Sequence, residues 1–521
     1  MSIRRLAVLC TAMLCAGMLV LCRVFWIAAD QSYAASAAAQ TVSETVLPIR
    51  RGNFYDRIGR PLTGVTPRWY ALCIPGDSSY ATLFPFVPFA QQAQLYARRN
   101  SITPFLIEVE NDLSANGVFM VADARRYLPT PIARHLIGYL DGDGHGMTGL
   151  EKAYDDLLAA AGDAQAVLCT TTARGDLLAG TTPQVQTTAR GTNTAITLTL
   201  DANIQRACEA IAAKNMSKGC IIVMQVGSGQ ILASTSMPEF DPDDIAASIR
   251  ADDTSLINRS LSAFSAGSVF KVVLAAAAYA QGLDWFTYDC TGSIQIGDET
   301  ITCSGVHGEQ TLKEAFAHSC NAAFAQIAEE LGADTLRRYT EKAGLTSAYS
   351  VDGLPTAKGT FNWDGITAGQ LGWAGVGQYH DQVNPCAFLL WMGAIANGGR
   401  AAEPYLIQKT VSSLGIPSLP HITQHTGQLI DSRTAATVAD FMANNVTETY
   451  GTKRFPNMEL CAKSGTAEVG TGQTPHAWFA GFLQNEDAPY AFVVLVENGG
   501  GGNAVAGTVA GKVLDIIVNG Y

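Results

Sequence analysis

The chain has 521 residues, of which 48% are hydrophobic and 15% are charged, and its formal net charge is −12. This apolar content excludes a largely disordered chain, and the length favours two or three domains. The acidic balance argues against a nucleic-acid-binding protein, because no global positive field attracts phosphates.

The N-terminal segment predicts a membrane anchor. Two arginines, at positions 4 and 5, precede an apolar segment at residues 6–29 that only Arg23 interrupts. Such a run can span a bilayer, and positive residues stay inside, so we predict a cytoplasmic tail at 1–5, a transmembrane anchor at 6–29 and an exported remainder. The alternative is a cleavable signal peptide with an Ala-Ser-Ala site at 35–37, although the apolar segment is long for that role.

Composition divides the exported part into three regions. Residues 30–46 are rich in Ala, Ser and Thr and predict a stalk, whereas residues 47–190 mix short strand-like and helical segments and predict a mixed α/β domain. A Thr-, Gly- and Pro-rich linker near residue 190 leads to residues 191–521, where strand and helix signals follow each other densely. The prediction is a multidomain α+β protein.

The elements of these regions can be taken in chain order. A helical apolar spacing covers residues 150–158. The runs predicted to be strands are residues 219–224, 230–233, 458–463, 476–482 and 490–497, and residues 293–302 resemble a hairpin. The runs predicted to be helices are residues 269–280, the segment after Thr311-Leu312-Lys313-Glu314 with its capping-box spacing, and residues 503–518.

Ser268 and Lys271 form the only S-x-x-K motif of the chain, at the start of an Ala-rich predicted helix. Spacing of three residues puts both side chains on one helix face, where a desolvated, neutral lysine can accept the serine proton. The helix N-terminus also offers N–H groups to a developing oxyanion. The motif alone is weak evidence, because a chain of this length contains about one or two by chance.

Two later segments carry complementary chemistry. Ser319-Cys320-Asn321 offers a hydroxyl for proton relay and an amide that can bind a substrate carbonyl or a lysine, although alone it is an ordinary helix cap. Lys463-Ser464-Gly465-Thr466 ends a predicted strand, whose edge can pair with an extended peptide while the lysine attracts a carboxylate. Gly465 would let a substrate approach the backbone closely.

The order of these three motifs is far more specific than any one of them, and it matches the penicillin-recognising serine acyltransferases. Further segments resemble class B penicillin-binding proteins, the monofunctional peptidoglycan D,D-transpeptidases. These segments are Arg51–Leu62, Gly149–Glu151, Thr199–Gln205, Gly229–Pro242, Gly375–Gly399 and His476–Phe482. The resemblance implies an N-terminal pedestal (dimerisation-type) domain at 47–190 and a transpeptidase (penicillin-binding) domain at 191–521, with a central antiparallel sheet flanked by helices.

The resemblance also implies a role for each motif residue. Ser268 would attack the carbonyl of the penultimate D-Ala of a stem peptide, and Lys271 would take its proton. Ser319, with Lys463 nearby, would return a proton to the leaving amine, and Asn321 would hold Lys271 and the substrate amide.

Substrate binding would fall to the third motif. Backbone N–H groups of Ser268 and Thr466 would form the oxyanion hole. Ser464, Gly465 and Thr466 would bind the donor peptide, with the two hydroxyls on its terminal carboxylate. No metal or other cofactor is expected.

The implied partners are peptidoglycan stem peptides, β-lactams that acylate Ser268, the cytoplasmic membrane and a SEDS-type glycosyltransferase. The expected location is the cell membrane, with one span and an extracytoplasmic catalytic domain. A β-lactamase or β-lactam sensor shares the three motifs, and a mainly non-catalytic scaffold for the polymerase is a further alternative. Elongation, division and sporulation roles stay open, as does a disulfide between Cys290 and Cys303.

Overall fold

The computed structural model describes residues 3–30, 42–47, 50–160, 164–172, 177–178, 180–188, 194–251, 254–412 and 414–520. It begins with the helix α1 (Ile3–Ala29), whose span Arg4–Ala29 has a mean hydropathy of 2.2 and no buried residue. This length and composition suffice to cross a bilayer, and a signal sequence meets the same test. The alternative cleavage site at 35–37 lies outside the described residues.

The chain divides into two compact units. The first comprises Met1–Arg50, Thr66–Arg125 and Asp163–Arg190, and the second comprises Arg51–Val65, Arg126–Gly162 and Gly191–Tyr521. The structure thus differs from the expected pedestal at 47–190, because two parts of that region belong to the second unit. The expected boundary at 190 falls within residues 189–193, which lie outside the described part of the chain.

Two three-stranded antiparallel sheets build the first unit. One has the order β4 (Phe105–Val109), β3 (Thr66–Cys73), β5 (Met120–Arg125), and the other has the order β1 (Val42–Val46), β6 (Ala164–Thr170), β7 (Gln184–Thr188). The helices α3 (Asp77–Leu83) and α4 (Phe89–Ala97) share a hydrophobic core with β3 and β4. Residues 42–46, expected in the stalk, therefore form a strand, because their alternating Val-Ser-Glu-Thr-Val pattern pairs with β6.

Buried ion pairs join the first segment of the second unit to a later segment of the same unit. Arg51 donates hydrogen bonds to Glu151 at 3.3 Å and to Asp155 at 2.7 Å, and Arg126 donates to Glu151 at 2.5 Å. The Glu151 side chain is fully buried. The resemblance motifs around residues 51 and 151 thus meet in one ion-pair network, and a buried carboxylate without such partners would cost several kcal/mol.

Backbone pairing adds to this network. β2 (Asn53–Tyr55) pairs in parallel with β8 (Ala195–Leu198), in a sheet that β19 (Ile407–Val411) completes.

The predicted helix over 150–158 is two short helices, α6 (Gly149–Ala153) and α7 (Asp155–Ala160), which meet at Tyr154.

A five-stranded antiparallel sheet forms the centre of the second unit and confirms the predicted fold class. Its order is β10 (Ile231–Met237), β9 (Gly219–Gln225), β22 (Tyr490–Val496), β21 (His476–Leu483), β20 (Leu460–Ala467). Alternate residues of each strand enter two separate hydrophobic cores, so the sheet is covered on both faces.

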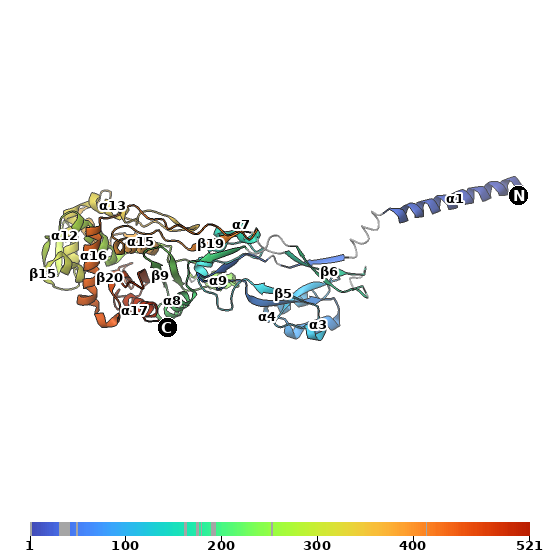
Figure 1. Ribbon diagram of the computed structural model, residues 1–521, viewed down its shortest axis with the longest axis horizontal. Helices are drawn as coiled ribbons and strands as arrows, with labels where there is room; N and C mark the ends of the chain where they lie inside the picture. The colour runs from blue at the N-terminus through green and yellow to red at the C-terminus, as the bar shows by residue number, and fades with distance from the viewer. Residues whose placement is uncertain are drawn as a thin grey trace. The chain divides into compact units, whose positions relative to one another are not determined.

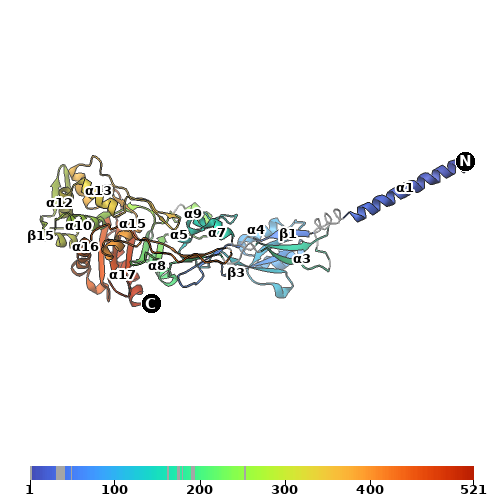
Figure 2. The same cartoon turned by 45° about the horizontal axis from the view of Figure 1, so that its top comes forward.

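Helices supply both covers (Figures 1 and 2). One core contains residues of α8 (Ala202–Asn215) and α17 (Ala506–Asn519). The other contains residues of α10 (Lys271–Ala280), α15 (Pro385–Ala396) and α16 (Ser432–Asn445). The last helix, α17, begins three residues later than the sequence predicts.

The remaining elements surround this sheet or belong to the first unit. Helices α11 (Leu312–Ala317), α12 (Asn321–Leu331) and α14 (Ala368–Gly375) lie near two strand pairs, β12 (Thr287–Cys290) with β15 (Gly308–Thr311) and β13 (Ser293–Ile296) with β14 (Glu299–Thr302). Helix α13 (Ala333–Lys342) packs against α10 and α12. The predicted capping box of Thr311 and Glu314 is present at α11. The shorter elements are α5 (Arg134–Ile137), α9 (Ile245–Ala251), β11 (Phe264–Ser265), β16 (Ser350–Val351), β17 (Leu354–Pro355), β18 (Gln382–Val383), η1 (Phe84–Phe86), η2 (Ser114–Asn116) and η5 (Thr452–Arg454).

Candidate active site

Ser268 lies in a tight turn that precedes α10, a buried helix of the second unit. The turn η3 (Gly267–Phe270) is a 3-10 helix, and α10 follows from Lys271, so the helix predicted from Val269 begins with a tighter turn. Gly267 has a φ of +57°, and a Cβ there would lie 2.6 Å from the Thr466 carbonyl oxygen. Only glycine therefore lets η3 approach β20 this closely.

Lys271 is completely buried one turn after Ser268. Its Nζ donates to the Ser319 carbonyl at 2.7 Å, to Ser319 Oγ at 3.3 Å and to Asn321 Oδ1 at 2.7 Å. Burial lowers the pKa of Lys271 to about 7. A large fraction of this lysine is therefore neutral near pH 7 and can accept a proton.

The Ser319–Asn321 segment joins α11 to α12. Ser319 has a φ of +52°, a left-handed conformation that non-glycine residues rarely adopt and that stores strain. The Asn321 amide donates to the Thr302 carbonyl at 2.9 Å, so its Oδ1 stays directed at Lys271. The surrounding hydrogen bonds thus hold a strained serine between the two helices.

Lys463 approaches Ser319 from the central sheet. Its Nζ donates to Ser319 Oγ at 3.0 Å and to the Ser464 carbonyl at 3.0 Å, and the side chain is buried. Burial, together with the charge of Lys271, lowers the pKa of Lys463 well below its usual range. Two lysines with lowered pKa values therefore flank one hydroxyl, which is a proton-relay arrangement.

The sequence predicted the Lys-Ser-Gly motif at the end of a strand. In the structure the motif lies inside β20, which continues to Ala467. Gly465 lets β20 approach η3 closely, since a Cβ at this position would lie 2.9 Å from the Val269 nitrogen. Ser464 Oγ accepts a hydrogen bond from the Tyr450 hydroxyl at 3.1 Å, and Thr466 Oγ1 accepts one from the Gly502 N–H at 3.1 Å. Thr466 is exposed, whereas Ser464 is half-buried.

β20 is an edge strand, and side chains of the protein bind most of its outward backbone groups. The Ala462, Ser464 and Thr466 carbonyls accept from side-chain donors at 2.9, 3.0 and 3.4 Å, and the Ser464 N–H donates to a hydroxyl at 2.8 Å. The partners are Asn445, Lys463, Gln378 and Tyr450, respectively. Outward groups alternate along a strand, so the Thr466 N–H faces the same edge as the Ser464 N–H.

The structure brings four of the expected residues into direct contact: Lys271, Ser319, Asn321 and Lys463. Among the described residues, no hydrogen bond joins the Ser268 hydroxyl to this group. Sequence reasoning missed Tyr450, at the end of the π-helix η4 (Val446–Tyr450), because a lone tyrosine far from the motif gives no signal.

Comparisons with known proteins identify the family of the chain. The profile of the penicillin binding protein transpeptidase domain matches residues 219–515. Peptidoglycan D,D-transpeptidase PbpA of Mycolicibacterium smegmatis is 30% identical over 412 residues, which are 72% of this chain and 79% of that protein. Stage V sporulation protein D of Bacillus subtilis is 27% identical over 430 residues, 78% of this chain and 65% of that protein.

Solved structures share the fold. Penicillin-binding protein A from M. tuberculosis, as a ceftriaxone acyl-enzyme complex, has a TM-score of 0.68 at 22% identity, over 90% of this chain and 99% of that one. The D,D-transpeptidase domain of a peptidoglycan glycosyltransferase from Eggerthella lenta has a TM-score of 0.67 at 23% identity, over 91% of this chain and 100% of that one. The chain therefore belongs to the penicillin-binding protein transpeptidase family, which confirms its resemblance to the class B penicillin-binding proteins.

Proposed function

We propose that this protein cross-links peptidoglycan stem peptides by D,D-transpeptidation, with Ser268 as the acylated residue. The observation that carries the proposal is the buried pair of lysines around Ser319, of which Lys271 lies one turn after Ser268. The pKa of Lys271 is lowered to about 7 and that of Lys463 is lowered well below its usual range, so both amines can exchange protons with hydroxyls. The family relationship supports the same chemistry.

Acylation begins at the nucleophile. Ser268 Oγ bonds to the carbonyl carbon of the penultimate D-Ala, and neutral Lys271 takes the hydroxyl proton. The carbonyl electrons move to its oxygen, where the N–H groups of Ser268 and Thr466 stabilise the negative charge. Among the described residues, none accepts a hydrogen bond from the outward N–H of Thr466, whereas the edge groups beside it have partners, so this N–H suits the role.

Release of the terminal D-Ala follows. The C–N bond breaks as the leaving nitrogen takes a proton from the Ser319 hydroxyl, and Lys463 resupplies that proton. The hydroxyls of Ser464 and Thr466 hold the terminal carboxylate. An amine of a neighbouring stem then attacks the ester carbonyl and gives one N–H proton back to Lys463 through Ser319. The ester C–O bond breaks, and Ser268 Oγ recovers its proton from Lys271 as the new amide forms.

Membrane attachment through α1 keeps this site outside the cell, in line with the arginines that precede the span. We expect a SEDS-type glycosyltransferase as the partner that supplies glycan strands. One similar fold, with a TM-score of 0.72 at 22% identity, comes from a structure titled for the coordination of polymerization and crosslinking by a peptidoglycan synthase complex.

Fluorescent penicillin tests the proposal on the full chain in detergent. We expect one stable covalent band on the parent, complete loss of the band in Ser268→Ala, and a parent-like band in the matched control Ser262→Ala. A folded parent without a band would refute the proposal, and rapid turnover of the adduct would favour a β-lactamase. Full support of host growth by Ser268→Ala would favour the scaffold role.

Acylation should also depend on pH. The pKa of Lys271 is lowered to about 7 by burial, while the nearby Cys303 and Cys320 thiols oppose the shift. The neutral, proton-accepting form of Lys271 grows as pH rises through that value, so the acylation rate should rise and then level off above about pH 7. Initial labelling rates on both sides of this pH check the prediction. A rate that is flat or falls across the range would contradict it.

A further inference from the structure

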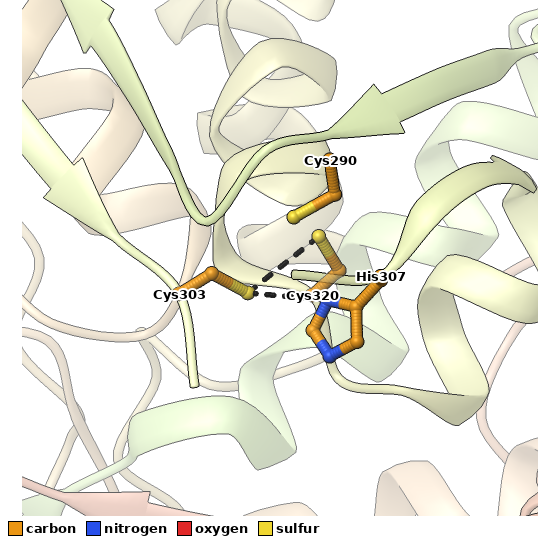
Figure 3. Close-up of side chains that lie close together, drawn as sticks. All are labelled: Cys290, Cys303, His307 and Cys320. Carbon is orange, nitrogen blue, oxygen red and sulfur yellow. Dashed lines mark hydrogen bonds between the residues drawn. The ribbon is translucent and has the colours of Figure 1, made fainter. Parts of the chain in front are cut away.

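Three cysteines and a histidine gather at the start of α12 (Figure 3). They are Cys290 at the end of β12, Cys303 after β14, His307 in the following loop and Cys320 at the N-cap of α12. Their possible ligand atoms all lie within 4.8 Å of one another. Cys290 and Cys320 are buried, and the other two are half-buried.

Two separations within the cluster match the edges of a tetrahedral metal site. The sulfur atoms of Cys303 and Cys320 are 3.7 Å apart, and Cys303 Sγ is 3.5 Å from His307 Nδ1. Ligands about 2.3 Å (sulfur) and about 2.0 Å (nitrogen) from Zn²⁺ give a sulfur–sulfur edge of about 3.8 Å and a sulfur–nitrogen edge of about 3.5 Å. A disulfide requires about 2.05 Å. All twelve cysteines, each among the described residues, are free, so the disulfide considered between Cys290 and Cys303 is not formed here.

Backbone donors are directed at two of these sulfur atoms. The Asn321 N–H donates to Cys303 Sγ at 3.2 Å, and the Ala323 N–H donates to Cys320 Sγ at 3.5 Å. Both N–H groups belong to the first turn of α12, where the helix dipole favours negative charge. Such an environment stabilises thiolates, which are the forms that bind metal.

We propose that Cys290, Cys303, His307 and Cys320 bind one structural Zn²⁺ ion. Binding displaces the thiol protons to solvent and fills all four tetrahedral positions with protein ligands, so the ion takes no part in acyl transfer. This proposal replaces the expectation from the sequence that the protein binds no metal.

The ion would position Asn321. The N–H of Asn321 bonds the ligand Cys303, its Nδ2 bonds the carbonyl of Thr302, and its Oδ1 accepts from Lys271. Cross-linking β12, the loop after β14 and the start of α12 therefore holds a segment that contains the strained Ser319. Zinc would act on the active site through these positioning residues.

Metal content tests this inference directly. The full chain, purified in detergent without chelator or reductant, should contain about one zinc ion per chain by elemental analysis. Cys303→Ser and His307→Gln should lose it, whereas Cys208→Ser, at a buried cysteine on α8, and His318→Gln, whose ring stacks on His307, should retain it. Ser268→Ala should also retain it, so failure of the catalytic proposal and failure of this one are distinguishable.

Two further readouts complete the test. Removing zinc with a chelator should slow labelling by fluorescent penicillin by about 10-fold or more, and added zinc should restore the rate. Cobalt(II) added to the metal-free chain should give the visible bands of a tetrahedral thiolate site. A zinc-free parent that also binds no added zinc or cobalt would overturn the proposal even if every variant failed to fold. A parent mass about 2 Da below that of the reduced chain, from a disulfide within the cluster, would overturn it equally.

Discussion

Replacing Lys271 by arginine is expected to slow acylation of Ser268 by roughly 10²- to 10⁴-fold, the usual contribution of a general base. Arginine stays protonated in proteins and cannot accept the serine proton. Its fixed charge would also lie in a fully buried position close to Lys463. The time course of labelling by fluorescent penicillin measures the rate constant.

Lys313→Arg is the matched control, because Lys313 forms an exposed ion pair with Asp440 at 2.7 Å. It should label at the parental rate. Circular dichroism of Lys271→Arg would separate a folded, slow enzyme from an unfolded one. Parental labelling by folded Lys271→Arg would mean that another group accepts the proton.

The second large effect concerns stability. Arg259→Met should lower the free energy of unfolding of the second unit by about 3–5 kcal/mol. Arg259 is buried, its guanidinium donates to Glu497, and it also donates to the Thr254 carbonyl at 3.0 Å and hydroxyl at 2.7 Å. Methionine fills similar space but leaves the Glu497 carboxylate without its partner.

Urea unfolding, followed by tryptophan fluorescence, measures this effect. Arg337→Met serves as the control, because its partner Asp364 is 92% exposed and surface pairs contribute about 0–1 kcal/mol. Equal losses in the two variants would contradict the argument that burial makes the Arg259 pair important.

The central sheet was largely predictable because its strands are continuous apolar runs. Residues 476–482 and 490–497 were predicted within one residue of β21 and β22, since buried strands are recognisable without their partners. The end of β20 was not predicted, because lysine and glycine are depleted in strands, and pairing with β21 keeps Lys463 and Gly465 extended. The division of residues 47–190 depends on contacts such as that between Arg51 and Glu151, which no local pattern encodes.

The site shows the same contrast. Its three motifs are local, so the sequence identified Lys271, Ser319, Asn321 and Lys463, and the structure places them in contact. The cluster of three cysteines and a histidine, in contrast, is formed by residues from four separate segments of the chain. Cys290 and Cys303 alone suggested a disulfide, and only the fold adds His307 and Cys320 to them.

The edge strand β20 has a consequence for self-association. An open sheet edge is normally a template on which other chains add strands and aggregate. Here the protein's own side chains bind the outward carbonyls from Ala462 to Thr466 and the Ser464 N–H. A foreign strand finds too few free groups for a continuous ladder, whereas the proposed oxyanion contact needs only the Thr466 N–H. The hydrogen bonds from these side chains thus protect the edge from polymerising and leave that one contact possible.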